Sequence, residues 1–306
     1  MAPAAPTSSA SVPPSLPTLP ATSAAEAPAG QVPVATAGPS EPASPSETVP
    51  TSPASPNPDT AAPGTPAVAV EPPPPAAPVG VILHEQINGV INAYGDHQVG
   101  VALIDMADGH TYEYGARTKF VAASTAKILV AAAYYHLVES GSASLTAPLG
   151  GYVASFQIRQ MVQYSNNESW ALLRDAIGYQ RLREYAASIG INYDPAVNLL
   201  SPAEMAGLLN LLYAGQLINK QHTAELLSFM QHTNYESLIP AAVPPDISVF
   251  HKYGWLNGNL HDASILVQGD RSFVFVIYTL GNYANGLPAR TQVIHELTRI
   301  VVSALK

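Results

Sequence analysis

The stretch "FVAASTAKILVAAAYYHLVESG", Phe120 to Gly141, decides how the rest of the chain is interpreted. Its long apolar run predicts a buried helix that ends at Gly141. Ser124 and Lys127 stand three residues apart at the start of this helix. On a helix, side chains at positions i and i+3 share one face, with Cβ atoms about 5–6 Å apart. The Lys127 amine can therefore reach the Ser124 hydroxyl.

A serine and a lysine in this arrangement suit nucleophilic catalysis. Burial in an apolar wall lowers a lysine pKa from about 10.4, by up to several units, and a neutral amine can then accept the serine proton. The helix start also directs backbone N–H groups toward developing negative charge. The same spacing recurs at Ser303 and Lys306, where we assign no role. The spacing alone is therefore more often a feature of a solvated helix surface than of an active site.

The composition divides the chain at residue 79. Residues 1–79 hold 22 of the 29 prolines and contain no aromatic residue, Lys or Arg. Such a segment cannot bury enough apolar surface to offset its ordering entropy, so we predict a disordered Pro/Ala-rich linker. It would serve as a tether or as a ligand for Pro-binding modules. Residues 80–306 carry every aromatic and basic residue, and we expect them to form one domain.

Charge and hydropathy exclude several classes of protein. The net charge is -9 and no basic stripe is present, which argues against a nucleic-acid partner. No run of about 20 apolar residues occurs, so we expect no membrane span. The N-terminus lacks the features of a signal peptide. A long Pro/Ala/Thr tether before a domain is nevertheless typical of a spacer in a bacterial envelope, so we expect a secreted or cell-envelope protein.

The order of the predicted elements indicates an α+β fold. A helix from about residue 82 to 94 precedes a hairpin with the turn "ADGH", and several helices follow. One of these helices begins with a capping box formed by Ser201 and Glu204. Three strands after Pro245 and a final helix complete the chain. Two strands and then three strands, separated by helices, predict an αβα sandwich.

A second polar cluster, "SNN", places Ser165, Asn166 and Asn167 in a loop between helices. A hydroxyl and an amide there could relay a proton and hold a substrate amide. The same residues also suit a plain helix start, with Asn167 as its N-cap.

A third polar cluster, "HKYGW", lies on a predicted strand near the C-terminus. Lys252 could bind a substrate carboxylate as a point charge. Gly254 lets a ligand approach the backbone closely. An edge strand protected by a lysine would show the same pattern.

Three motifs in matching order resemble the active-site elements of class A β-lactamases and penicillin-binding proteins: Ser124-Thr-Ala-Lys127, Ser165-Asn166-Asn167 and Lys252-Tyr253-Gly254. The segments around the motifs resemble that family as well, and the resemblance covers Val79 to Lys306. It implies a serine hydrolase with a β-lactamase-like fold. That fold is an αβα sandwich with a five-stranded, mainly antiparallel sheet and a helical subdomain.

The resemblance also implies the catalytic roles. Ser124 would be the acylated nucleophile, and Lys127 would be its base or proton relay. Ser165 would pass a proton to the leaving nitrogen. The backbone N–H groups of Ser124 and Trp255 would form the oxyanion hole.

The way the substrate is held follows from the same resemblance. Asn167 would contact the substrate amide, while Lys252 and Gly254 would line the strand that binds its carboxylate. The implied partner is a small molecule, either a β-lactam or a cell-wall peptide, and we expect a monomer. No metal or organic cofactor is implied.

Two features depart from the family pattern. The middle residue of the third motif is usually Thr or Ser, whose hydroxyl helps hold the substrate carboxylate, and Tyr253 replaces it here. The segment Gly190–Ser201 is much shorter than the family's omega loop, which carries a Glu that activates the deacylating water. In "DPAVN", Asp194 to Asn198, Asp194 is a candidate for that role. A Pro-containing turn before the Ser201 cap explains the same segment.

The second motif can be aligned in two registers. Tyr164-Ser165-Asn166 matches the Tyr-x-Asn form of class C β-lactamases and some D-Ala peptidases, with Tyr164 as the proton relay. We favour Ser165-Asn166-Asn167 because the flanking helices resemble those of class A enzymes. Tyr164 is then expected to pack in the core.

Three functions are compatible with these residues. The first is a hydrolase that forms an acyl-enzyme with β-lactams or related amides and esters. The second is a D-Ala-D-Ala carboxypeptidase or another cell-wall peptidase on the same fold, which need not hydrolyse β-lactams quickly. The third is a non-catalytic envelope protein with a degenerate site. An ordinary Lys127 pKa would favour this third function.

Overall fold

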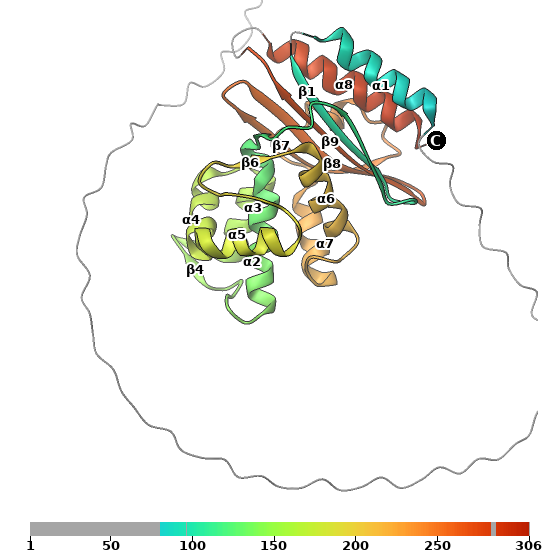
Figure 1. Ribbon diagram of the computed structural model, residues 1–306. Coiled ribbons are helices and arrows are strands. Elements are labelled where there is room, and N and C mark those ends of the chain that lie inside the picture. Colours follow the sequence, from blue (N-terminus) through green and yellow to red (C-terminus); the bar gives the residue numbers. More distant parts are fainter. Residues whose placement is uncertain (1–79, 96, 283–285, 306) are drawn as a thin grey trace, which may run out of the picture. The chain divides into compact units, whose positions relative to one another are not determined.

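A five-stranded antiparallel sheet forms the centre of the domain. The computed structural model describes residues 80–95, 97–282 and 286–305. The strand order is β2-β1-β9-β8-β7, and each neighbouring pair is antiparallel (Figure 1). The strands are β1 Gln98–Asp105, β2 His110–Gly115, β7 Ser248–Leu256, β8 Asn259–Gln268 and β9 Arg271–Leu280. The predicted sheet is therefore confirmed, and β7 is one of its two edges.

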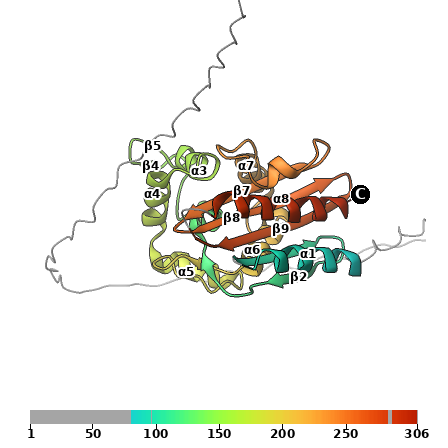
Figure 2. The same cartoon turned by 90° about the horizontal axis from the view of Figure 1, so that it is seen from above.

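Alternating side chains give this sheet two apolar faces. On β1, Val101 and Leu103 join one buried cluster, whereas Ala102 and Ile104 join the other. Two helices cover the first face, namely α1 Val81–Ala93 and α8 Leu287–Ser303. Figures 1 and 2 show these two helices side by side along the sheet.

The remaining helices lie on the side of the other face, where residues 202–213 pack against β1, β8 and β9. Helix α2 Lys127–Glu139 is buried continuously from Lys127 to Tyr135, as expected of a helix in the middle of a core. The same layer contains α3 Ala154–Gln163, α4 Asn167–Ile177, α5 Tyr179–Ser188, α6 Pro202–Tyr213 and α7 Lys220–Phe229. Helices thus lie on both faces of the sheet, which confirms the predicted αβα sandwich.

Local signals predicted some elements well and others not at all. The capping box before α6 is present: Ser201 Oγ accepts from Glu204 N at 3.1 Å, and Glu204 Oε2 accepts from Ser201 N at 2.8 Å. Helix α3 was not predicted. Several short elements were also missed because two to four residues carry no periodic pattern: β3 Phe120–Val121, η1 Ala123–Ala126, β4 Pro148–Leu149, β5 Tyr152–Val153, β6 Leu199–Leu200 and η2 Ile239–Ala242.

The predicted linker, residues 1–79, lies outside the described residues. The boundary that we place at residue 80 therefore stays a prediction. Among the helices of residues 80–305 that the structure describes, none has the length and hydropathy needed to cross a membrane.

Candidate active site

Ser124 lies on a tight turn between a short strand and α2. Strand β3, which starts at Phe120, pairs with β6, so the helix expected from Phe120 onward begins only after this pairing ends. Ser124 belongs to the 3₁₀ turn η1, which leads directly into α2 at Lys127. Ala123 has a φ of 51°, a left-handed conformation that costs a non-glycine residue about 1–3 kcal/mol. Strain of this kind persists where the surroundings hold it, and functional sites are a frequent place for it.

Two hydrogen bonds hold this turn from opposite sides. Asn198 Nδ2 donates to Ala123 O at 3.1 Å. From the sheet, His261 Nε2 lies 2.9 Å from Val121 O, and His261 Nδ1 accepts from Thr279 N at 3.1 Å. Burial lowers the pKa of His261 to about 4, so the ring is neutral and its Nε2–H donates to Val121 O. His261 thus has a structural role, because it holds the Ser124 turn against β9.

Lys127 is buried beside Ser124, and its amine donates to the loop before α4. Nζ donates to Ser165 O at 2.6 Å and to Asn167 Oδ1 at 2.8 Å, and Ser165 Oγ lies 3.4 Å away. All three acceptors belong to the 165–167 loop, so Ser124 is not among them. Burial lowers the pKa of Lys127 from 10.5 to about 7, in the predicted direction. A neutral amine has two N–H groups for the two short bonds and one lone pair to accept a proton.

Ser165 lies between two lysine amines. Its Oγ accepts from Lys252 Nζ at 2.9 Å and lies 3.4 Å from Lys127 Nζ. Ser165 is a second non-glycine residue of the site with a left-handed backbone, at φ 56°. Because its neighbours are donors, the hydroxyl hydrogen of Ser165 is available for a substrate atom. The fold thus joins one residue from each of the three motifs.

Lys252 is fully buried on β7. Its Nζ also donates to Tyr253 O at 3.2 Å and lies 4.2 Å from the centroid of the Tyr253 ring. Burial, followed by repulsion from Lys127, lowers the pKa of Lys252 well below 10.5. Asp262 acts in the opposite direction but does not outweigh these causes. The amine is therefore a hydrogen-bond donor inside the protein rather than a surface charge.

A charged network lies next to Lys252. His251 Nδ1 lies 2.9 Å from Asp262 Oδ1, and His251 Nε2 lies 3.2 Å from Glu236 Oε1. Burial opposes ionisation of His251, but the carboxylates of Asp262 and then Glu236 raise its pKa to about 9. The imidazolium therefore donates to both carboxylates at neutral pH. It balances the fully buried charge of Asp262, which also accepts from Ile239 N at 3.0 Å.

The second motif begins helix α4. Asn166 is the N-cap, and its Oδ1 accepts from Ser169 N at 2.8 Å. The prediction that Asn167 would be the N-cap is wrong, because Asn167 is the first helical residue. Its side chain is used differently, since its Oδ1 accepts from Lys127. The Asn167 Nδ2 group then has hydrogens to offer a substrate.

Tyr164 closes α3 just before this motif. Its side chain is 44% exposed, so the expectation that it packs in the core is wrong. The bonds to Lys127 and Lys252 are made by Ser165 and Asn167. These contacts favour the Ser165-Asn166-Asn167 register.

Strand β7 passes close to the Ser124 turn at Gly254. A Cβ atom at this position would lie 3.1 Å from Ser124 N and 3.0 Å from Ala122 O. Such distances are tighter than ordinary van der Waals contacts, so the close approach depends on glycine. The Ser124 N–H therefore lies at the gap where the predicted oxyanion hole, with the Trp255 N–H, would form.

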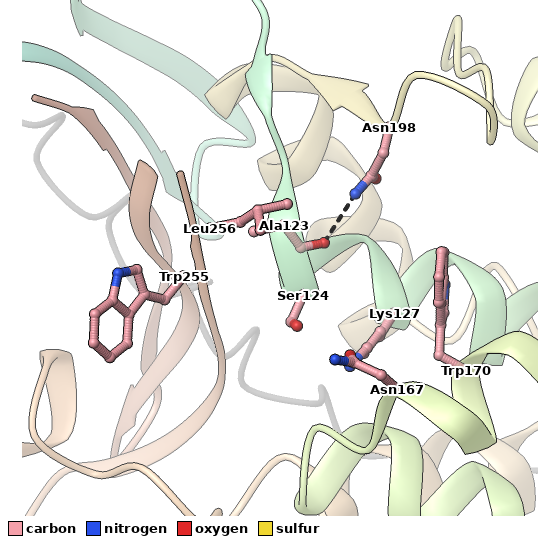
Figure 3. Close-up of a pocket in the computed structure, with 8 residues that line it drawn as sticks. All are labelled: Ala123, Ser124, Lys127, Asn167, Trp170, Asn198, Trp255 and Leu256. Carbon is pink, nitrogen blue, oxygen red and sulfur yellow. Dashed lines mark hydrogen bonds between the residues drawn. The ribbon is translucent and has the colours of Figure 1, made fainter. Parts of the chain in front are cut away.

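A cavity of about 280 Å³ opens at Ser124. Its walls are drawn in Figure 3 and consist of Ala123, Ser124, Lys127, Asn167, Trp170, Asn198, Trp255 and Leu256. In this view Trp170 and Trp255 lie on opposite sides of Ser124, and Asn167 lies beside Lys127. Four of the predicted residues therefore meet around one space.

Sequence reasoning missed four residues of the cavity wall: Ala123, Trp170, Asn198 and Leu256. A weak signal existed for two of them, because Trp170 follows the second motif by one helical turn and Leu256 follows Trp255. Asn198 stands out in the sequence only as the last residue of "DPAVN". The position of Asn198 in the cavity wall depends on the pairing of β3 with β6, which no local sequence pattern predicts.

Five predicted residues are not part of the cavity wall: Ser165, Lys252, Tyr253, Gly254 and Asp194. The side chains of Tyr253 and Asp194 have partners elsewhere. The Tyr253 ring packs against Tyr235, with ring centroids 4.9 Å apart, in the cluster that α1 and α8 cover. Asp194 Oδ1 accepts from Ala196 N at 3.0 Å and from Arg183 at 2.8 Å. These hydrogen bonds lower the pKa of the exposed Asp194 carboxyl. Neither side chain is part of the cavity wall.

The antiparallel sheet between two helical layers, with a serine turn facing its edge strand, is the β-lactamase-like class of fold. The chain belongs to the beta-lactamase enzyme family, whose sequence model matches residues 82–305. No reviewed protein sequence matches the chain.

Solved structures share the fold at low sequence identity. A mutant of PBP-A, solved as an acyl-enzyme complex with penicillin G, is 22% identical with a TM-score of 0.67, covering 76% of this chain and 98% of that chain. The class A β-lactamase of the last common ancestor of Gram-negative bacteria is 23% identical with a TM-score of 0.66, covering 73% and 99%. A β-lactamase from Sphaerobacter thermophilus is 21% identical with a TM-score of 0.64, covering 72% and 97%.

Proposed function

We propose that this protein is a serine hydrolase that forms an acyl-enzyme on Ser124 with β-lactams or related amides and esters. The observation that carries the proposal is a cavity at Ser124 beside a buried lysine with a pKa of about 7. A general base is most effective when its pKa lies near the working pH. The penicillin G acyl-enzyme of PBP-A, a protein of the same fold, supports the same chemistry here.

Acylation begins with the neutral amine of Lys127. Ser124 Oγ attacks the carbonyl carbon while its proton moves to Lys127 Nζ, and a C–O bond forms. Ser165 Oγ lies 3.4 Å from this amine and can take a proton from it while giving its own proton to the leaving group. The C–N or C–O bond of the substrate then breaks, and the acyl group stays on Ser124. Lys252 holds the Ser165 hydroxyl for this transfer, at 2.9 Å.

The developing oxyanion needs donors that are already in place. We assign this role to the backbone N–H groups of Ser124 and Trp255, on either side of the close approach at Gly254. One such donor is typically worth about 10²–10³ in rate. The Nδ2 group of Asn167 would hold the acyl amide of the substrate, because its Oδ1 already accepts from Lys127.

We infer that hydrolysis of the acyl-enzyme is slower than its formation. Of the residues that line the cavity, Lys127 is the ionisable one, so activation of water falls to the same amine. The Asp194 carboxylate is engaged by Arg183 at 2.8 Å and is not part of the wall. This arrangement also supports a second candidate function, a D-Ala-D-Ala peptidase that β-lactams acylate persistently.

Intact mass recorded against time, after addition of excess benzylpenicillin, tests the proposal. The expected result is a persistent adduct of one penicillin on the wild type and none on Ser124→Ala. Antibiotic consumption without an observable adduct would contradict slow hydrolysis while supporting an acyl-enzyme mechanism. No adduct and no consumption, with β-lactams and with esters, would contradict the proposed function and favour a non-catalytic envelope protein.

The second candidate function has its own assay. A diacylated peptide ending in D-Ala-D-Ala is incubated with the wild type and with Ser124→Ala, and released D-Ala is measured. Release by the wild type alone would support a cell-wall peptidase. Release by both proteins would come from a contaminant and would count against it.

We also propose that the protein acts in the cell envelope or outside the cell. β-Lactams and cell-wall peptides meet enzymes there, and a Pro/Ala-rich segment of 79 residues ahead of the domain suits a spacer. Fractionation of cells that produce the full chain checks this, and recovery of the protein only with cytosolic markers would contradict it.

A further inference from the structure

The peptide bond between Ala123 and Ser124 has a protein partner at each end. Its carbonyl oxygen, Ala123 O, accepts from Asn198 Nδ2 at 3.1 Å (Figure 3). Strand β7 approaches its nitrogen, since a Cβ atom at Gly254 would lie 3.1 Å from Ser124 N. The bond is trans, and the C=O and N–H of a planar trans peptide point in opposite directions. A hydrogen bond that fixes the Ala123 carbonyl therefore also fixes the direction of the Ser124 N–H.

The conformation of Ala123 has to be held by its surroundings. Its φ of 51° is one that residues other than glycine rarely adopt. Without support, the alanine would relax toward an ordinary φ and the Ser124 N–H would turn with it. Asn198 contacts two consecutive peptide units here, because its backbone O also accepts from Ala122 N at 2.9 Å. Asn198 is itself left-handed, at φ 54°, a conformation that asparagine tolerates better than most residues.

Tyr193 sets the orientation of the Asn198 amide. The Tyr193 side chain is buried, and its hydroxyl donates to Asn198 Oδ1 at 3.0 Å. Burial, and after it the charge of Asp194, raises the pKa of Tyr193, so the phenol keeps its proton at neutral pH. With Oδ1 bound to this donor, the amide NH₂ faces Ala123 O, whereas the flipped amide would present oxygen to oxygen. The Tyr193–Asn198 pair is therefore in place before a substrate binds.

This arrangement bears on the oxyanion that forms during acylation. A backbone donor stabilises an oxyanion only where it already points at the developing charge. The bond from Asn198 also polarises the Ala123–Ser124 peptide, which makes its N–H a stronger donor. Neither effect needs Asn198 to touch the substrate. Because the charge develops in the transition state, the benefit should appear in the rate constant of acylation rather than in substrate binding.

We propose that Asn198, oriented by Tyr193, is a positioning residue for acylation that directs the Ser124 N–H toward the oxyanion through its hold on Ala123 O. This inference rests on the proposed acyl-enzyme function and goes beyond it. The same side chain could instead hold the water that hydrolyses the acyl-enzyme. The structure favours the positioning role, because both ends of the Asn198 amide are bound to the protein.

Asn198→Gly tests the positioning role, since glycine keeps the left-handed backbone but lacks the amide. Adduct formation with benzylpenicillin is followed by rapid-quench intact mass over a range of concentrations. This yields the acylation rate constant and the dissociation constant of penicillin separately. The rate constant should fall about 100-fold, while the dissociation constant should stay within about threefold. Asn192→Gly, at an exposed position of the same segment, is the control and should react like the wild type.

Tyr193→Phe is a conservative test that keeps the packing of the ring. Loss of the hydroxyl should lower the acylation rate constant by roughly five- to tenfold, the effect of one hydrogen bond. Tyr185→Phe is the matched control, because Tyr185 is buried in the same cluster and its hydroxyl has no partner in the described part of the chain. This control should leave the rate constant unchanged. Equal rate constants for the two variants would overturn the inference, whether or not Asn198→Gly folds.

A second change at Ala123 tests the route of the effect. Glycine adopts a φ near 51° without being held, so Ala123→Gly should make Asn198 less necessary. In the Ala123→Gly background, the loss caused by Asn198→Gly should shrink from about 100-fold to about tenfold or less. An undiminished loss would show that Asn198 does not act through Ala123 and would contradict the proposal.

The remaining outcomes separate this inference from the function on which it rests. Slower hydrolysis of the adduct with unchanged acylation would assign Asn198 to the attacking water and reject the positioning role. A weaker affinity with an unchanged rate constant would make Asn198 a substrate contact and would also reject it. In both cases the acyl-enzyme function would stand. No adduct on the wild type beyond that on Ser124→Ala, and no consumption of the antibiotic, would overturn the function and the inference together.

Discussion

Two segments border the cavity: residues 120–127 through Ser124 and residues 190–201 through Asn198. They differ in where they place their ionisable side chains. The first segment brings in Lys127, which is 3% exposed and has a pKa lowered to about 7 by burial. The second segment turns its carboxylate, Asp194, toward Arg183 in an exposed ion pair at 2.8 Å. Burial that shifts a pKa is a frequent mark of a catalytic group, whereas an exposed ion pair is screened by solvent and contributes little to stability. The contrast supports a site better equipped for acylation than for hydrolysis of the acyl-enzyme.

Removal of the buried Lys127 amine should have the largest effect, and it should act on the rate of acylation. Lys127→Ala should lower the second-order rate of acylation by about 10³, within the range typical of a lost general base. The rate is measured by intact mass or by release of a chromogenic leaving group. Lys220→Ala, at the exposed start of α7, is the control and should react like the wild type. A Lys127→Ala protein that reacts within tenfold of the wild type would show that another group takes the Ser124 proton.

A smaller loss of acylation rate is expected when Gly254, where β7 passes close to Ser124, is replaced. Gly254→Ala should slow acylation by about 100-fold, because the added Cβ would press on Ser124 N and displace the oxyanion donors. Gly207→Ala in α6 is a matched control, since a Cβ there would meet nothing within 4 Å. This control should keep full activity and gain up to about 1 kcal/mol in the free energy of unfolding. Equal activity of the two variants would contradict the importance of the Gly254 contact.

The pH dependence of acylation tests the state of Lys127. The reactive form is the neutral amine, so the acylation rate should rise with pH through a pKa of about 7. Between pH 6 and pH 8 the neutral fraction grows from about one tenth to about nine tenths, which predicts a roughly tenfold rise in rate. An uncharged ester is the suitable substrate, because it does not titrate in this range. A flat profile, or a rate that falls with pH, would argue against an amine base.

The smallest effect is expected at Asp194, in the segment 190–201. Asp194→Asn should change the deacylation rate less than about twofold, because the carboxylate is exposed and engaged by Arg183. The rate is followed as recovery of unmodified protein after excess substrate is removed. Arg183→Gln should behave in the same way. Deacylation at least tenfold slower in Asp194→Asn would restore Asp194 as the group that activates water.

Elements with a strong local pattern were predictable. The α6 capping box and the β1–β2 hairpin both follow from residues that are close in sequence, and both are present. The start of helix α2 was not predictable, because the pairing of β3 with β6 places residues 120–121 in a strand. A propensity for helix cannot compete with a contact whose partner lies far along the chain.

The candidate site likewise has some features that the sequence predicts and others that only the folded structure determines. Ser124, Lys127, Ser165 and Asn167 could be proposed because three short motifs, in a fixed order along the chain, resemble those of a known family. Their mutual bonds needed the folded structure, as did the identity of Asn166 as the α4 cap. The exposure of Tyr164 and the place of Asn198 in the cavity wall were likewise beyond local pattern.

Three short motifs in a fixed order, and the family that they resemble, were thus enough to propose a nucleophile, a base and a relay, because each motif is local in sequence. The packing of the folded chain determined that Lys127, and not Lys252, lines the cavity. It also determined that the Tyr253 ring packs on Tyr235 and that Asp194 pairs with Arg183. Those features depend on burial, and burial arises only when η1, the 165–167 loop and β7 come together. These segments are separated by long stretches of chain, so their contacts exist only in the complete fold.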